Sequence, residues 1–157
     1  MNFDEIYQTY WQRIFRLCMG YVNDYDLAQD IAQETFIIVW QQLPKFRAES
    51  DPGTWIFRIA SNTCLRQIEK DKRYIKTALP SDLKEEKQPS AERQIQLLYR
   101  FISELPELDR IIISLELEDV RQAEIAAITG LSETNIRVRI HRIKEKLTKK
   151  FNTYGRP

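Results

Sequence analysis

The sequence predicts an all-α protein of two small helical domains joined by a flexible linker, with a helix-turn-helix in the second domain. Three observations predict this fold. Apolar residues recur at helical spacing along most of the chain, no alternating apolar run is bounded by hairpin turns, and residues 78–91 lose periodicity altogether. Hydrophobic residues make up 43% and charged residues 30%, a balance that suits a helical protein with packed cores.

The first helix is expected to run from about Asp4 to Tyr21. Its inward-facing residues recur at helical spacing, and they are Ile6, Tyr10, Ile14, Leu17 and Cys18. Asn23 and Asp24 then break the pattern, because short polar side chains favour turns.

Boundary signals mark the next two helices. Asp26 can cap a helix from Leu27 to Leu43, and Pro44 stops that helix because proline lacks the backbone donor. A polar loop follows, and Thr54 is a plausible cap for a third helix, over residues 55–73. Residues 1–77 are therefore expected to form the first domain.

Residues 78–91 have the composition of a linker. They are rich in Lys, Glu, Ser and Gln, and both Pro80 and Pro89 disfavour helix. At about 3.3–3.6 Å per extended residue, fourteen residues reach no more than roughly 46–50 Å. The linker can therefore hold two domains on neighbouring sites while leaving them separate, with the second domain over residues 92–157.

The second domain is expected to contain a helix-turn-helix. Two helices over 92–104 and 107–118 precede a short helix over 124–129, a turn at Gly130 and a long last helix. One apolar stripe on that last helix faces inward, formed by Ile136, Ile140, Ile143 and Leu147. Two helices joined by a short glycine turn are typical of proteins whose second helix enters the DNA major groove.

The opposite face of the last helix carries the candidates for reading duplex DNA. Arg137 and Arg142 suit bidentate contact with guanine, and Val138 can touch a thymine methyl. His141 can read a neighbouring base edge, and Lys144 flanks this face. The alternative for the lysines toward the C-terminus is a solvated helix end that complements the helix dipole.

Charge is distributed unevenly along the chain, although the net charge is only +1. Residues 137–157 hold eight basic residues against one acidic residue, and residues 55–77 hold six against two. Residues 26–43 hold three acidic residues and no basic one. This asymmetry indicates two cationic surfaces for phosphate and an acidic surface for another partner, with solvated helix faces as the alternative.

The acidic segment has the features of a docking surface. Asp30, Gln33 and Glu34 share one helix face by their spacing, beside the large apolar side chain of Trp40. Such a face suits a basic, partly apolar partner surface, on which aromatic residues carry much of the binding energy. The alternative is a solvated acidic stripe with Trp40 in the core.

Several function classes find no support in the sequence. No apolar run approaches the ~20 residues of a membrane span, and the first residues lack a signal-peptide pattern, so we expect a cytoplasmic protein without membrane insertion. Cys18 and Cys64 are expected to be reduced core residues, and a single histidine leaves little for a metal site. With no Ser-His-Asp set or P-loop, we expect no enzyme, no cofactor and no small-molecule substrate.

Three motifs, in this order, resemble those of one family. They are residues 26–36 with Trp40, Phe46-Arg47 followed by residues 54–62, and Leu105-Pro106-Glu107 followed by the helix-turn-helix. The chain resembles a bacterial sigma factor of the extracytoplasmic-function group over about residues 3–151. The resemblance implies that residues 1–77 dock on core RNA polymerase and open the minus-ten element, while residues 92–157 read the minus-thirty-five element. It also implies an anti-sigma factor as a partner.

The resemblance assigns the melting of promoter DNA to the loop and helix after Pro44. Aromatic platforms in a cationic groove can hold unstacked bases, and this segment supplies both residue types. The residues expected to contact the minus-ten element are Phe46, Arg47, Asn62, Arg66 and Arg73. Trp55 and Phe57 are expected to be mostly structural.

Two other functions remain open from the sequence. A stand-alone helix-turn-helix regulator would bind an inverted repeat without polymerase, but it leaves the acidic helix and the aromatic loop unexplained. A polymerase-docking decoy would have lost DNA reading, and the presence of Arg137 and Arg142 speaks against it.

Overall fold

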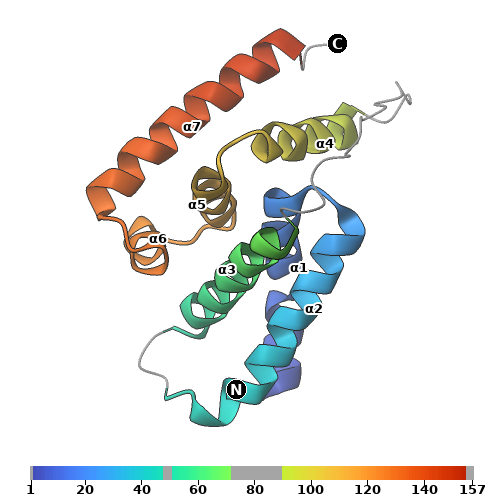
Figure 1. Cartoon of the computed structure of the whole chain (residues 1–157), viewed down its shortest axis with the longest axis vertical. Helices are drawn as coiled ribbons and strands as arrows, with labels where there is room; N and C mark the ends of the chain where they lie inside the picture. Colours follow the sequence, from blue (N-terminus) through green and yellow to red (C-terminus); the bar gives the residue numbers. More distant parts are fainter. Residues whose placement is uncertain (1, 48–50, 72–89, 155–157) are drawn as a thin grey trace.

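The computed structural model describes residues 2–47, 51–71 and 90–154, and every regular element in these ranges is helical (Figure 1). The elements are α1 (Phe3–Val22), α2 (Tyr25–Gln42), the 3-10 turn η1 (Leu43–Lys45), α3 (Pro52–Asp71), α4 (Ser90–Ser103), α5 (Glu107–Leu117), α6 (Gln122–Thr129) and α7 (Glu133–Tyr154). The all-α prediction is confirmed. None of these helices combines the length and the apolar character that a membrane crossing needs.

The first module is the three-helix unit α1–α3, in which α1 packs against both α2 and α3. The five residues of α1 that the sequence places inward are all buried. They meet a complementary apolar face formed by Ala28, Ile31, Phe36, Val39, Ile56 and Phe57. The helical spacing of apolar residues therefore predicts this core correctly, because a helix buries one stripe of its surface.

Two predicted helix starts are wrong by two or three residues. Asp24, rather than Asp26, caps α2: its backbone is extended and its Oδ1 accepts a hydrogen bond from the Leu27 amide at 3.1 Å. Thr54 lies in the first turn of α3 rather than at its cap, because the helix already begins at Pro52. Proline favours that first position, since its fixed φ suits a helix and its missing amide has no intrahelical partner there.

The second module comprises α4–α7, and the four stripe residues predicted on α7 are all buried in it. Gly130 has a φ of 80°, and its amide bonds to the Ala126 carbonyl at 2.8 Å, which ends α6. A left-handed residue at this position is what glycine supplies without strain. The predicted helix-turn-helix is therefore present, with α6 as its first helix and α7 as its second.

The two modules pack directly against each other, which the sequence does not predict. Helix α1 lies against α4 and α5, and α3 lies against α5 and α6 (Figure 1). Ser90 and Ala91, assigned to the linker, belong to the first turn of α4 instead. The rest of the predicted linker, residues 78–89, lies outside the described residues, as does the expected end of the third helix at Arg73.

Candidate functional site

The acidic row on α2 is exposed. Asp30, Gln33 and Glu34 all lie on the solvent side of the helix, whose buried side carries Ile31 and Thr35. Trp40 is 63% exposed, so the alternative that places it in the core is wrong. An exposed indole on the helix that carries two exposed carboxylates is available to a partner.

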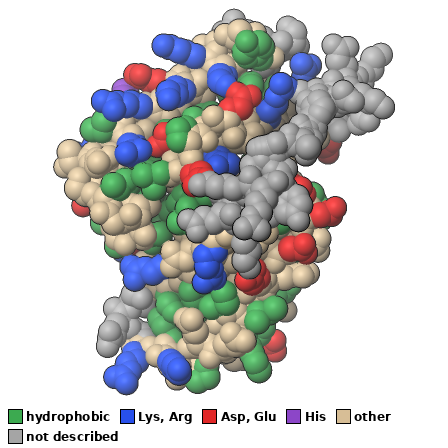
Figure 2. Space-filling model, in the orientation of Figure 1, with side chains coloured by type: hydrophobic (Ala, Val, Ile, Leu, Met, Phe, Trp, Pro, Cys, Tyr) green, Lys and Arg blue, Asp and Glu red, His purple; other side chains and the backbone are tan. Residues whose placement is uncertain are grey.

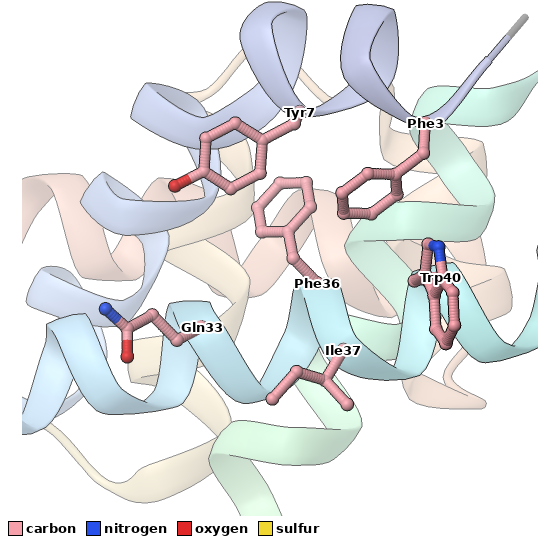
Figure 3. Close-up of a pocket in the computed structure, with 6 residues that line it drawn as sticks. All are labelled: Phe3, Tyr7, Gln33, Phe36, Ile37 and Trp40. Atoms are coloured by element: carbon pink, nitrogen blue, oxygen red, sulfur yellow. The ribbon is translucent and has the colours of Figure 1, made fainter.

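A groove of about 480 Å³ lies next to this row, between α1 and α2. Its lining residues are Phe3, Tyr7, Gln33, Phe36, Ile37 and Trp40, and Figure 3 shows the rings of Phe3, Tyr7 and Phe36 gathered between the two helices. Ile37 is 56% exposed at its edge. Phe3, Tyr7 and Ile37 were not predicted as site residues. The four-residue spacing of Phe3, Tyr7 and Trp11 is nevertheless a signal for an aromatic stripe.

A stacked aromatic pair joins Phe46, which follows η1, to Trp55 in the first turn of α3. The rings of Phe46 and Trp55 lie 4.5 Å apart between centroids, with an interplanar angle of 23°. Both side chains are half-buried, whereas Arg47 beside them is exposed. Phe57 is buried at 2% exposure, which confirms its structural role. Phe46 is thus held by Trp55 at the surface, next to a cation.

The outer face of α3 carries Asn62 and Arg66, one helical turn apart and both exposed. Arg66 donates through Nη2 to Thr63 Oγ1 at 3.3 Å, and Thr63 Oγ1 donates to the Ile59 carbonyl at 2.8 Å. The structure therefore brings an amide and a guanidinium onto one surface. Arg73, the fifth candidate of this group, lies outside the described residues.

Helix α7 presents the predicted duplex-reading residues to solvent. Ser132 Oγ accepts a hydrogen bond from the Asn135 amide at 3.1 Å and so caps the helix. Arg137, Val138, His141 and Arg142 are exposed, opposite the buried stripe. Figure 2 shows Lys and Arg side chains along the edge of the molecule where α7 runs. Val138, 42% exposed among these cations, provides an apolar contact of the kind that a thymine methyl accepts.

Polar contacts divide the side chains on this face of α7 into two groups. Lys144 Nζ lies 3.0 Å from Glu116 Oε2 on α5, and His141 Nε2 lies 2.9 Å from Glu145 Oε1. In the part of the chain that the structure describes, Arg137 and Arg142 form no ion pair. These two arginines are therefore free for a base or a phosphate, whereas Lys144 already has a partner on α5.

The two cysteines belong to the core. Cys18 and Cys64 are free and fully buried, with their Sγ atoms 3.8 Å apart. The hydrogen bond between the thiols and their burial hold the pKa of Cys64 well above its ordinary value, which disfavours a reactive thiolate. The prediction of reduced core residues is confirmed. Among the described residues, no three His, Cys, Asp or Glu side chains are grouped so as to hold a metal ion.

Comparison with known proteins identifies the family. The family model described as Sigma-70 region 2 matches residues 6–74, and the one described as Sigma-70, region 4 matches residues 95–147. The ECF RNA polymerase sigma-E factor of Salmonella typhimurium is 31% identical over 94% of this chain and 85% of its own length. This chain belongs to the extracytoplasmic-function sigma factors.

Other sigma factors align over nearly the whole chain. The ECF RNA polymerase sigma factor SigM of Bacillus subtilis is 27% identical over 97% of this chain and 96% of its own length. The fold matches that of the sigma factor RpoE from Bartonella quintana, solved with the anti-sigma factor NepR, with a TM-score of 0.78 and 18% identity. The match covers 97% of this chain and 98% of that one.

The chain is therefore a sigma factor, a protein that binds RNA polymerase and directs transcription initiation at promoters. The family is not a class of enzymes. A stand-alone helix-turn-helix regulator, the alternative that the sequence leaves open, does not account for a region 2 match over residues 6–74.

The unpaired arginines of α7 give the first testable expectation. Arg137→Ala or Arg142→Ala is expected to cost about 1–3 kcal/mol in affinity for duplex DNA and to relax the preference at one base pair. Lys149, exposed on the same helix, is the matched control. Lys149→Ala is expected to weaken all sequences alike and to lower the salt slope by about one ion. Titrations against a set of single-base variants measure both effects, and an even loss across sequences for the arginine variants would exclude direct readout.

Proposed function

We propose that the two modules of this sigma factor divide promoter recognition between them. The first module, assigned to residues 1–77, docks on core RNA polymerase, then reads and opens the minus-ten element. The second module, from Ser90 onward, reads the minus-thirty-five element as duplex DNA through α7. The chain performs no catalysis itself, and its activity consists of these contacts.

The docking assignment rests on the exposed indole of Trp40, which lines the apolar groove and belongs to the same helix as the acidic row. Burying an exposed aromatic side chain removes a large apolar area from water, and aromatic residues dominate binding energies at many interfaces. Asp30 and Glu34 add charges that favour a basic partner surface and steer its approach. Gln33 lines the groove and adds a neutral donor and acceptor.

Promoter opening is assigned to the surface formed by the aromatic loop and the outer face of α3. Separated bases lose their stacking partners, and a ring held at the surface can replace part of that stacking. Phe46, supported by Trp55, supplies the ring. Asn62 can pair with a base edge, and Arg47 and Arg66 favour the phosphate backbone. Arg73 is also assigned to a phosphate contact, because of its position in the family motif.

Sequence reading is assigned to the exposed side of α7. Arg137 and Arg142 contact guanine, Val138 contacts a thymine methyl, and His141 reads a neighbouring edge. Lys144 is assigned to a backbone phosphate of the DNA. To reach it, the Lys144 side chain first has to separate from Glu116. The partners of the chain are therefore core polymerase and promoter DNA, in the cytoplasm. An anti-sigma factor, the kind of protein seen in complex with the sigma factor RpoE, is the third partner.

The docking assignment is tested by replacing two exposed aromatic residues of α2 by alanine, one at a time. Trp40→Ala is expected to weaken binding to core polymerase by about 2 kcal/mol, roughly 30-fold, because it removes an exposed aromatic contact. Tyr25→Ala is the matched control, since Tyr25 lies at the other end of α2 and is also 63% exposed. Fluorescence anisotropy with labelled sigma factor measures the affinity, and circular dichroism checks the fold. Equal affinities for the two variants would remove the docking role of this surface.

A further inference from the structure

Asn135 is an exposed amide in the first turn of α7, outside the set of residues predicted to read duplex DNA. It lies three residues before Val138 and seven before Arg142, so the three side chains follow one face of the helix. In a helix-turn-helix, the N-terminal residues of the second helix contact base edges in the major groove. Asn135 therefore extends the duplex-reading face by one turn toward the start of α7.

The amide of Asn135 is held by Arg139, one turn further along the same helix. Arg139 Nε donates a hydrogen bond to Asn135 Oδ1 at 2.9 Å. A guanidinium has only donors, so the atom that faces it must be the amide oxygen rather than the amide nitrogen. Within the described part of the chain, no hydrogen bond engages the Nδ2 amino group. Its two N–H donors are therefore available to DNA.

Arg139 is itself anchored outside the recognition helix. Its Nη1 donates to Asp109 Oδ1 on α5 at 3.1 Å, and the Asp109 side chain is only 15% exposed. The planar guanidinium uses different nitrogens for its two partners, so it ties the Asn135 amide to a fixed point on α5. A side chain that is held in this way before DNA arrives loses less conformational entropy on binding.

An amino group presented to the major groove selects a base by its acceptors. Guanine offers two acceptors there, N7 and O6, whereas cytosine offers the N4 amino group as a donor. Adenine is read by both ends of an asparagine amide, with the oxygen accepting from N6 and the nitrogen donating to N7. That contact needs Asn135 Oδ1, which already accepts from a charged donor. Guanine is therefore the base that the held amide fits best.

We propose that Asn135 is a further base-reading residue of α7, and that Arg139 and Asp109 hold its amide so that it selects guanine. Asn135 makes the base contact, whereas Arg139 and Asp109 are positioning residues that act through it. This inference rests on the proposed reading of the minus-thirty-five element by α7, and it adds one base contact of defined chemistry to that reading.

Asn135→Asp tests the contact most sharply, because it keeps the size of the side chain and reverses its chemistry. The carboxylate can still accept from Arg139, but it presents an acceptor to the base, which suits the N4 donor of cytosine. Holoenzyme is assembled from core polymerase and each variant, and its affinity is measured for duplexes that the wild type selects from a random pool. Each base pair of the minus-thirty-five region is then varied in turn.

One base pair is expected to report on Asn135. There the wild type should prefer guanine by about fivefold or more, Asn135→Asp should prefer cytosine, and Asn135→Ala should have no preference. Profiles that neither substitution changes would overturn the base contact, and a wild-type preference for adenine at that position would overturn the selection of guanine. Arg137→Ala and Arg142→Ala separate the two levels of the argument. If they alter the profile while the Asn135 variants do not, only this inference fails; if none of them does, reading by α7 fails with it.

Arg139→Met tests the positioning role, because it keeps a long unbranched side chain and removes both hydrogen bonds. The freed amide can offer its oxygen and its nitrogen together, so the preference at the same base pair should move from guanine toward adenine by roughly fivefold. Lys149→Met removes an equal charge at an exposed site on α7 and should weaken all sequences alike. Circular dichroism checks the fold of each variant. An unchanged guanine preference in Arg139→Met would mean that Arg139 and Asp109 do not position the amide.

Discussion

Replacing Phe46 or Asn62 by alanine is expected to leave the initial duplex complex intact and to lower promoter opening roughly 5- to 150-fold. That range corresponds to the loss of about 1–3 kcal/mol of base contact. Phe46 is held against Trp55 at the surface, and Asn62 is exposed on the same module, so both are accessible to a base that has left the duplex. Permanganate footprinting of unpaired thymines measures the opening step directly.

A premelted template provides the control for this experiment. When the bubble already exists, the variants no longer have to compete with base stacking in the duplex, and transcription should recover to a large extent. Phe57→Leu makes a useful contrast, because Phe57 is buried and its replacement acts on the stability of the module rather than on bases. A normal bubble in both surface variants would exclude base capture by Phe46 and Asn62.

The helical core could be predicted from the sequence because local periodicity determines it. The inward residues of α1 and the stripe on α7 recur at helical spacing, and each is buried as predicted. The residue at which a helix starts is harder to predict, because several residues near each start can serve as its cap. Asp24 and Asp26 are both good capping residues, and only the backbone geometry at Asp24 decides between them.

The contact between the modules could not be predicted in the same way. Arg16 on α1 donates two hydrogen bonds to the Glu118 carboxylate, yet the two residues are separated by 102 residues, and each reads in isolation as an ordinary surface charge on a helix. Gly20, near the end of α1, lies close to Ser114, which is within an apolar run, and neither position has a local signal for this contact. A single sequence shows which face of a helix is apolar, but it does not show which distant helix packs against a polar face.

The same limit applies to the docking surface. The acidic spacing of Asp30, Gln33 and Glu34 is visible in the sequence, but the exposure of Trp40 is not, because a tryptophan at helical spacing is compatible with either a core or a surface. The structure also adds Phe3 and Tyr7 from α1 to the groove. A site built from two helices becomes recognisable only when their packing is known.

Shortening the segment between the modules is expected to have the largest effect, which is loss of transcription with both modules still functional. Residues 78–89 number twelve and reach at most roughly 40–43 Å, whereas six residues reach at most roughly 20–22 Å. Elements at minus ten and minus thirty-five lie roughly 85 Å apart, at about 3.4 Å per base pair. Each module adds a diameter of about 28 Å, so the whole span is at most roughly 96–99 Å with the full-length segment and roughly 76–78 Å with the shortened one. Deleting residues 79–84 should therefore prevent simultaneous contact with the two promoter elements.

The measurement is in vitro transcription with purified core polymerase, together with separate binding of a minus-thirty-five duplex and a single-stranded minus-ten oligonucleotide. The deleted protein should bind each oligonucleotide as the wild type does, because the helices that carry the contacts are unchanged. Replacing residues 79–84 by a Gly/Ser sequence of equal length should retain transcription, since length rather than side-chain chemistry sets the reach. Normal initiation by the shortened protein would mean that its two modules do not hold the two promoter elements at the same time.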